Sequence, residues 1–92
     1  MKQYVIEREI PQVGGLNREQ LKGVAATSNE ALAKLAGKAQ WMQSFVVADK
    51  TFCIYLADGE QSVREHARLS GFPATRITEV CNVIGPMTAV AG

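Results

Sequence analysis

Hydrophobic and polar residues follow two different periods along this chain, and the changes of period divide it into six elements. Runs at 3–9, 40–47, 51–57 and 79–84 are rich in β-branched and aromatic residues or alternate, which predicts strands. Apolar residues spaced three and four apart predict two helices, one from the cap Asn17 to Gly37 and one from the cap Asp58 to about Ser70. Residues 72–76 are expected to form a loop or a single helical turn, and residues after Gly85 a plain tail.

The order strand-helix-strand-strand-helix-strand is typical of the ferredoxin-like, split βαβ arrangement. This α+β fold has one antiparallel sheet with two helices on one face. Right-handed crossovers place the first and third strands in its centre, with the fourth beside the first. The length of 92 residues predicts one domain, 1–92.

The third strand is apolar on both of its faces, which argues that both faces are buried. We therefore expect a homodimer in which two sheets pack face to face. Alternation suggests that Cys53 points away from the helices. In the second strand, Trp41, Phe45 and Val47 are predicted to share one face.

Composition and charge argue against several classes of function. Net charge is +1 and the basic residues are scattered, so no nucleic-acid partner is expected. Charge near the N-terminus and the lack of an apolar run of roughly 18 residues predict a soluble, cytoplasmic protein with no membrane partner. Cys53 and Cys81 are too few for an iron–sulfur cluster, and we expect them to be free thiols.

The only histidine, His66, lies on the apolar face of the second predicted helix. Glu7 and Glu9 share one face of the first strand, and an imidazole with carboxylates suits a divalent ion such as nickel or zinc. His66, Glu7 and Glu9 are therefore the candidate metal ligands. If Tyr4 and Ile6 face inward instead, Glu7 turns away from His66 and this site cannot form.

Other readings of the same residues stay open. His66 could be a core histidine bonded within the protein, and Glu7 could pair with an arginine such as Arg64 or Arg68. Four further residues are candidate walls of a pocket near His66: Phe72, Tyr55, Trp41 and Cys53.

Several blocks spread over the chain form one pattern: Tyr4-Val5-Ile6-Glu7-Arg8, Trp41, Asp49-Lys50 before Cys53-Ile54-Tyr55, Arg64-Glu65-His66-Ala67, Gly71-Phe72-Pro73-Ala74 and Ile77-Thr78-Glu79-Val80. This pattern resembles a family of small bacterial proteins of unknown function that includes nickel-binding members. The resemblance implies a dimeric ferredoxin-like domain and, for some relatives, bound nickel. Glu7, His66 and Phe72 are the residues that match its motifs.

Three functions are compatible with these features. The leading one is a protein that stores, buffers or senses a divalent metal through His66 and nearby carboxylates, with nickel as the metal that the resemblance suggests. The second is a dimeric enzyme of monooxygenase or isomerase type, with His66 as acid or base and Glu7 orienting it. The third is an interaction module without a site. A polar, ion-sized space beside His66 would favour the first, and an apolar, ligand-sized one the second.

Overall fold

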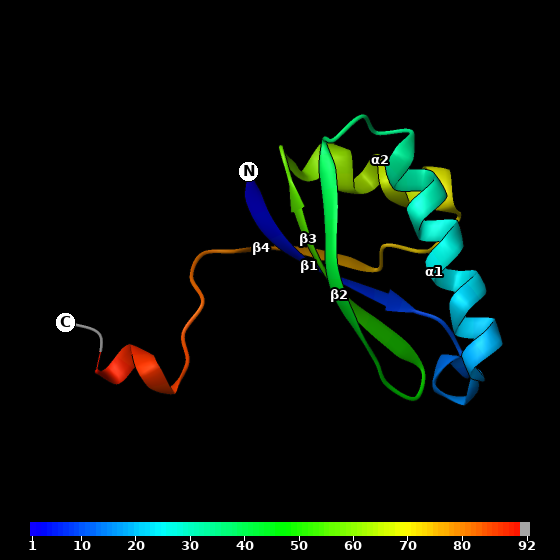
Figure 1. Ribbon diagram of the computed structural model, residues 1–92, viewed down its shortest axis with the longest axis horizontal. Coiled ribbons are helices and arrows are strands. Elements are labelled where there is room, and N and C mark those ends of the chain that lie inside the picture. The colour runs from blue at the N-terminus through cyan, green and yellow to red at the C-terminus, as the bar shows by residue number, and fades with distance from the viewer. Residues whose placement is uncertain (91–92) are drawn as a thin grey trace.

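The computed structural model of this chain describes residues 1–90, and its elements follow the predicted order. The strands are β1 (Lys2–Glu9), β2 (Ala39–Val46), β3 (Lys50–Ala57) and β4 (Arg76–Val80). The helices are α1 (Arg18–Ala33) and α2 (Glu60–Ser70), with short 3-10 helices η1 (Val13–Gly15) and η2 (Pro86–Ala89). The strands form one antiparallel sheet in the order β2-β3-β1-β4, with both helices on one side (Figure 1), so the predicted α+β topology is confirmed.

The helix ends follow local chemistry. Asn17 and Gln20 exchange side-chain and backbone hydrogen bonds of 2.9 Å, which is the capping box expected at the start of α1. At the other helix, Gly71 has φ 80° and its N–H donates to the Ala67 carbonyl, which confirms Gly71 as the stop. The predicted cap Asp58 was wrong: Gly59 is the N-cap of α2, and the Asp58 carboxylate accepts from the Ser62 hydroxyl instead.

β1 turns Tyr4, Ile6 and Arg8 toward the helices, where they are 3%, 0% and 2% exposed. Glu7 and Glu9 therefore lie on the outer face of the sheet, because successive strand residues face opposite sides. This is the orientation under which the predicted metal site cannot form. Burial of Tyr4 and Ile6 removes large apolar side chains from water, whereas two carboxylates on that face would have to be desolvated.

The orientation of β3 follows from its pairing with β1. Tyr4 lies opposite Tyr55, and Ile6 lies opposite Cys53. Cross-strand partners point to the same side of a sheet, so Cys53 and Tyr55 face the helices and are buried. The expectation that Cys53 points away from the helices was wrong, because both faces of this strand are apolar and alternation alone could not choose between them.

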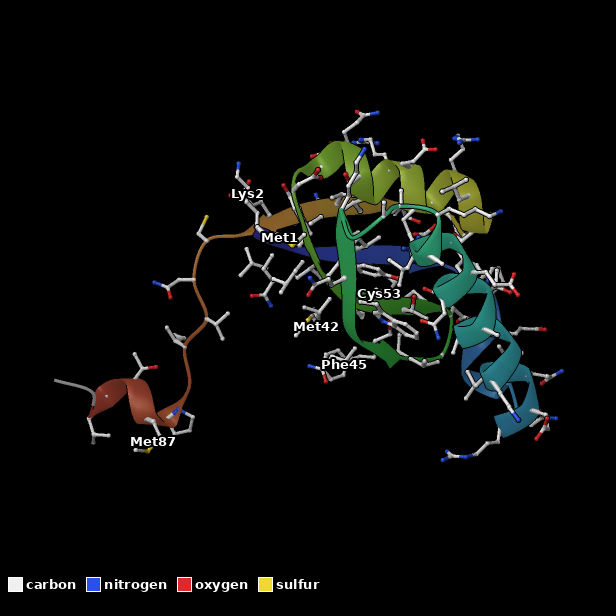
Figure 2. All side chains as sticks on the ribbon, turned by 45° about the horizontal axis from the view of Figure 1, so that its top comes forward. Met1, Lys2, Met42, Phe45, Cys53 and Met87 are labelled. Atoms are coloured by element: carbon white, nitrogen blue, oxygen red, sulfur yellow. The ribbon has the colours of Figure 1, made fainter. Side chains whose placement is uncertain are left out.

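A β-bulge at Met42 changes the direction of the side chains along β2. Trp41 pairs with Tyr55, and Gln43 pairs with Ile54, the neighbour of Tyr55 on β3. Met42 therefore has no partner in the strand register. The bulge turns Trp41 toward the helices and leaves Phe45 on the outer side, 53% exposed. The predicted common face of Trp41 and Phe45 was therefore wrong. Figure 2 shows Met42 and Phe45 on the side of β2 away from α1.

The fourth strand begins and ends earlier than predicted, at Arg76–Val80 rather than 79–84. Its register is set by β1, with Ile77 opposite Ile6. Residues 81–90 then leave the sheet as an extended arm that ends in η2 (Figure 1), and Met87 on this arm lies far from the sheet (Figure 2). Within residues 1–90, no helix is long and apolar enough to cross a membrane.

Candidate functional site

Four polar side chains from four different elements meet between the sheet and the helices. They are Arg8 of β1, Ser28 of α1, Tyr55 of β3 and His66 of α2, and we call them the buried polar cluster. Their exposed fractions are 2%, 4%, 2% and 1%. Because buried polar groups need hydrogen-bond partners, the contacts among these four side chains determine what the cluster can do.

The contacts of His66 define its tautomer. Nδ1 lies 3.3 Å from an Arg8 guanidinium nitrogen, and a guanidinium can only donate, so Nδ1 accepts. The ring proton therefore resides on Nε2, which lies 3.1 Å from the Ser28 hydroxyl oxygen and 3.4 Å from the Tyr55 hydroxyl oxygen. The two hydroxyl oxygens are 3.1 Å apart.

The electrostatics of the cluster favour the neutral forms of His66 and Tyr55. Burial and the neighbouring Arg8 cation lower the pKa of His66 to about 4, although a hydrogen bond to the Ser28 backbone opposes this shift. Burial raises the pKa of Tyr55, although the Ser28 hydrogen bond and Arg8 oppose that shift. At neutral pH Arg8 is therefore the only charged member of the cluster.

Arg8 has only neutral partners. One guanidinium nitrogen donates to the Pro73 carbonyl at 2.9 Å, and another donates to His66. The guanidinium carbon lies 6.0 Å from the centroids of both the Tyr55 and Phe72 rings, within cation–π range. In the part of the chain that the structure describes, no carboxylate comes within 4.0 Å of Arg8.

A cavity of about 220 Å³ lies between α1 and the sheet, next to the cluster. Arg8, Ser28 and Tyr55 form part of its wall, and His66 lies behind them. The rest of the wall is mostly apolar: Ile10, Val13, Leu21, Val24, Ala25, Trp41, Val46 and Phe72, with Ser44, Thr51 and Cys53. The Trp41 indole donates to the Ser44 hydroxyl at 2.9 Å, so its polar group is already bonded.

The structure brings together the four residues proposed as pocket walls. Phe72, Tyr55, Trp41 and Cys53 all line the cavity, and their role in binding stays a prediction. Both cysteines are free thiols, with Cys53 buried and Cys81 exposed.

The proposed metal ligands are not brought together. Glu7 lies on the outer face with one carboxylate oxygen 3.8 Å from the Lys50 ammonium, and Glu9 is exposed on the same face. Over residues 1–90, no group of three or more His, Cys, Asp or Glu side chains could hold a metal ion. His66 does not fit a metal either, because both ring nitrogens have partners and one partner is a cation.

The arginine partners suggested for Glu7 are engaged elsewhere. Arg64 pairs with Glu60 at 2.7 Å, and Arg68 pairs with Glu65. All four of these side chains lie on the exposed side of α2, on the opposite side of the sheet from Glu7.

Sequence reasoning missed Arg8 and Ser28 as members of a site. Two signals could have found them. Arg8 continues the inward-facing series of Tyr4 and Ile6 at a spacing of two. Ser28 interrupts the apolar stripe of α1, four residues after Val24, at a position where a polar side chain needs a buried partner.

Comparisons with known proteins agree with this fold. The crystal structure of SCO4226 from Streptomyces coelicolor A3(2) aligns with a TM-score of 0.72 at 14% identity, covering 89% of this chain and 99% of that chain. At this identity the likeness shows the fold alone. No curated protein matches the chain. A family profile described as "Nickel responsive protein SCO4226-like" matches residues 4–80. This chain therefore belongs to the SCO4226-like family of nickel-responsive proteins.

Proposed function

We propose that this protein binds a small, mostly apolar organic molecule in the cavity between α1 and the sheet. The observation that carries this proposal is the character of the space beside His66. At about 220 Å³ it is large enough for a molecule somewhat larger than benzene, and its wall is mostly apolar rather than a cluster of metal-binding groups. Concave apolar sites with a few convergent polar groups are where proteins bind small molecules.

His66 acts in this proposal as a positioning residue. It does not form part of the cavity wall; its two nitrogens engage Arg8 on one side and Ser28 and Tyr55 on the other. These three residues carry polar atoms to the cavity. A histidine with a pKa of about 4 is poorly matched to proton transfer at neutral pH, so the geometry favours binding over acid–base catalysis by His66.

The direct test is a cavity-filling substitution. Ala25 lies on the cavity wall and Ala26 is exposed on the same helix. We expect millimolar benzene to raise the thermal unfolding midpoint of the natural protein and of Ala26→Phe, because a ligand that binds only the folded state stabilises it. Ala25→Phe should show no such rise. Equal responses of all three proteins would contradict binding in the cavity.

Nickel binding is a second candidate, favoured by the description of the family. Within one protomer His66, Glu7 and Glu9 do not form a ligand set, for the reasons given above. A site that uses Glu7 and Glu9 would be an exposed carboxylate site on the outer face of the sheet. Two carboxylates are an incomplete ligand set for nickel, so water or a second copy would have to complete it.

Calorimetric titration of NiCl₂ into the full chain separates these possibilities. If nickel binds on the outer face, the double variant Glu7→Gln/Glu9→Gln should weaken binding at least tenfold, while His66→Gln leaves it unchanged. Loss of binding in His66→Gln would instead support the histidine-centred site. The absence of heat with the natural protein would remove nickel as a ligand of this chain alone.

We also propose that a second copy of the chain covers the outer face of the sheet. This face carries the apolar residues Val5, Phe45, Phe52, Ile54 and Leu56. The arm after β4, which leaves the sheet, carries further exposed apolar side chains: Val83, Ile84, Met87 and Val90 are 69%, 77%, 74% and 70% exposed. Apolar surface of this extent is typical of a protein interface.

A further inference from the structure

We propose that the ligand of the cavity is a small apolar monoanion of the carboxylate class, and that its charged group binds Arg8. This inference rests on the proposed function and specifies the chemical class of its ligand. It follows from the charge on the cavity wall, the donors around it and the size of the space.

The charge argument begins with Arg8. A guanidinium stays protonated in proteins, and a buried charge needs a counter-charge as well as hydrogen bonds. The partners of Arg8 are the Pro73 carbonyl, the neutral His66 ring and two aromatic faces, so none carries a negative charge. Arg8 also lies on the cavity wall. An anion in the cavity would supply the counter-charge that residues 1–90 do not.

The ligand should carry a single charge. Arg8 is the only charged residue on the cavity wall within the described chain. A dianion such as a phosphate monoester would bring a second negative charge into an apolar space that offers no second cation. An organic cation would be repelled by the positive charge of the guanidinium. A carboxylate carries one charge and matches the fork of a guanidinium with two parallel hydrogen bonds.

The hydroxyl groups beside Arg8 leave one hydrogen without an acceptor inside the cluster. Nε2–H of His66 donates to Ser28, the nearer of its two neighbours. The contact between Ser28 and Tyr55 uses one of their two hydroxyl hydrogens. The other hydroxyl hydrogen has no acceptor among the contacts of residues 1–90, and Ser28 and Tyr55 both line the cavity. It is a second donor for an anion next to Arg8.

The size of the space limits the rest of the ligand. A protein cavity of 150 Å³ holds benzene. By simple scaling, 220 Å³ holds roughly nine non-hydrogen atoms, about the size of benzoate. The hydrocarbon part would contact apolar residues of the wall such as Leu21, Val24 and Val13.

The test compares benzene derivatives of similar size that differ in charge. We would titrate benzoate, benzamide and benzylamine into the full chain by calorimetry. We expect benzoate to bind at least roughly tenfold more tightly than benzamide, because hydrogen bonds to a charged group are stronger than those to a neutral one. Benzylamine should bind most weakly.

Two variants assign the preference to its residues. Arg8→Met should bring the affinity ratio of benzoate to benzamide close to one, whereas Arg64→Met, which changes an exposed arginine of α2, should leave the ratio unchanged. Tyr55→Phe removes a hydroxyl while keeping the ring, and it should reduce benzoate affinity severalfold. The comparison in the natural protein stands even if Arg8→Met does not fold.

The outcomes separate this inference from the function on which it rests. Equal affinity for benzoate and benzamide in the natural protein would overturn the anion inference and leave the cavity-binding proposal standing. If the three probes do not bind and benzene gives no stabilisation, the cavity-binding proposal fails as well. A benzoate preference that survives in folded Arg8→Met would overturn the role of Arg8.

Discussion

At the scale of single residues, His66 shows how neighbours decide the chemistry of a side chain. On the sequence it is the one group suited to binding a metal or exchanging a proton near neutral pH. In the fold, the Arg8 guanidinium donates a hydrogen bond to Nδ1, and the Ser28 and Tyr55 hydroxyl oxygens lie within hydrogen-bond distance of Nε2. Burial beside a cation stabilises the neutral ring. In this form His66 forms hydrogen-bond contacts with three residues of the cavity wall, Arg8, Ser28 and Tyr55.

The depressed pKa of His66 predicts an acid-sensitive protein. The folded-state pKa of about 4 lies below the ordinary value of 6.5, so the unfolded chain binds more protons between these values. The stabilising contribution is therefore fully present above pH 6.5 and is lost as pH falls toward 4. Its full size is on the order of 3 kcal/mol. Urea unfolding at pH 7 and pH 4.5 measures most of this contribution.

The control for this pH dependence is His66→Gln, which lacks the titrating ring. Its free energy of unfolding should fall less between pH 7 and pH 4.5 than that of the natural protein. The same fall in both proteins would show that other groups carry the acid sensitivity.

Ser28 should contribute to stability out of proportion to its size. Ser28→Ala removes the nearest acceptor for Nε2–H of His66 and the hydrogen bond to Tyr55. We expect the free energy of unfolding to fall by about 1–2 kcal/mol. The matched control is Asn29→Ala, an exposed neighbour that gains a similar amount of helix propensity. Chemical denaturation of both variants measures the difference, and equal stabilities would argue against the cluster.

At the scale of elements, the shape of the cavity depends on irregular features. The bulge at Met42 turns Trp41 and Ser44 to the same side of β2, where both line the cavity. At one end, η1 carries the buried Val13 on the cavity wall, and Gly14 beside it donates a backbone hydrogen bond to Ala48 at 3.0 Å. Without η1, the Val13 side chain would not form this part of the cavity wall.

Gly14 allows a close approach that no larger residue could make. A Cβ atom at this position would lie 2.6 Å from the Val47 carbonyl oxygen and 2.8 Å from the Ala48 Cα, both backbone atoms. Gly14→Ala should therefore lower the free energy of unfolding by about 1–3 kcal/mol. Gly15→Ala is the control, because its Cβ would meet nothing within 4 Å. Thermal or urea unfolding of the pair tests this, and equal effects would refute it.

At the scale of the whole molecule, the two faces of the sheet differ in what covers them. The inner face holds the core and both helices. The outer face has no covering element within residues 1–90, and it combines apolar residues of β2 and β3 with the pair Glu7–Lys50. This asymmetry is the reason for proposing a second copy there.

Charge placed on the outer face should break the proposed dimer. Phe45 is 53% exposed and pairs across the strands with Phe52. We expect the natural protein to have the mass of a dimer by light scattering and Phe45→Glu to have that of a folded monomer, because burial of an unpaired carboxylate at an interface is unfavourable. Ala26→Glu, on the exposed side of α1, should remain dimeric. A monomeric natural protein at millimolar concentration would falsify the proposal.

Local patterns in the sequence were enough to predict the order of the elements and several of their ends. Hydrophobic periods of two and 3.6 residues are local properties, so they identify strands and helices without knowledge of the fold. Asn17 and Gly71 mark helix ends because capping bonds and a left-handed backbone involve only neighbouring residues. The topology followed, because few arrangements of six such elements obey the rules of connection.

Long-range packing sets which face of each strand points inward, and the site depends on that orientation. A period of two defines two faces without ranking them, and on β3 both faces are apolar. Pairing with β1 turned Tyr55 to the same face of the sheet as Arg8, while Glu7 lies on the outer face. The bulge at Met42 depends on strand register, which is a long-range property. The cavity and the buried Arg8 charge on its wall therefore exist only in the assembled fold.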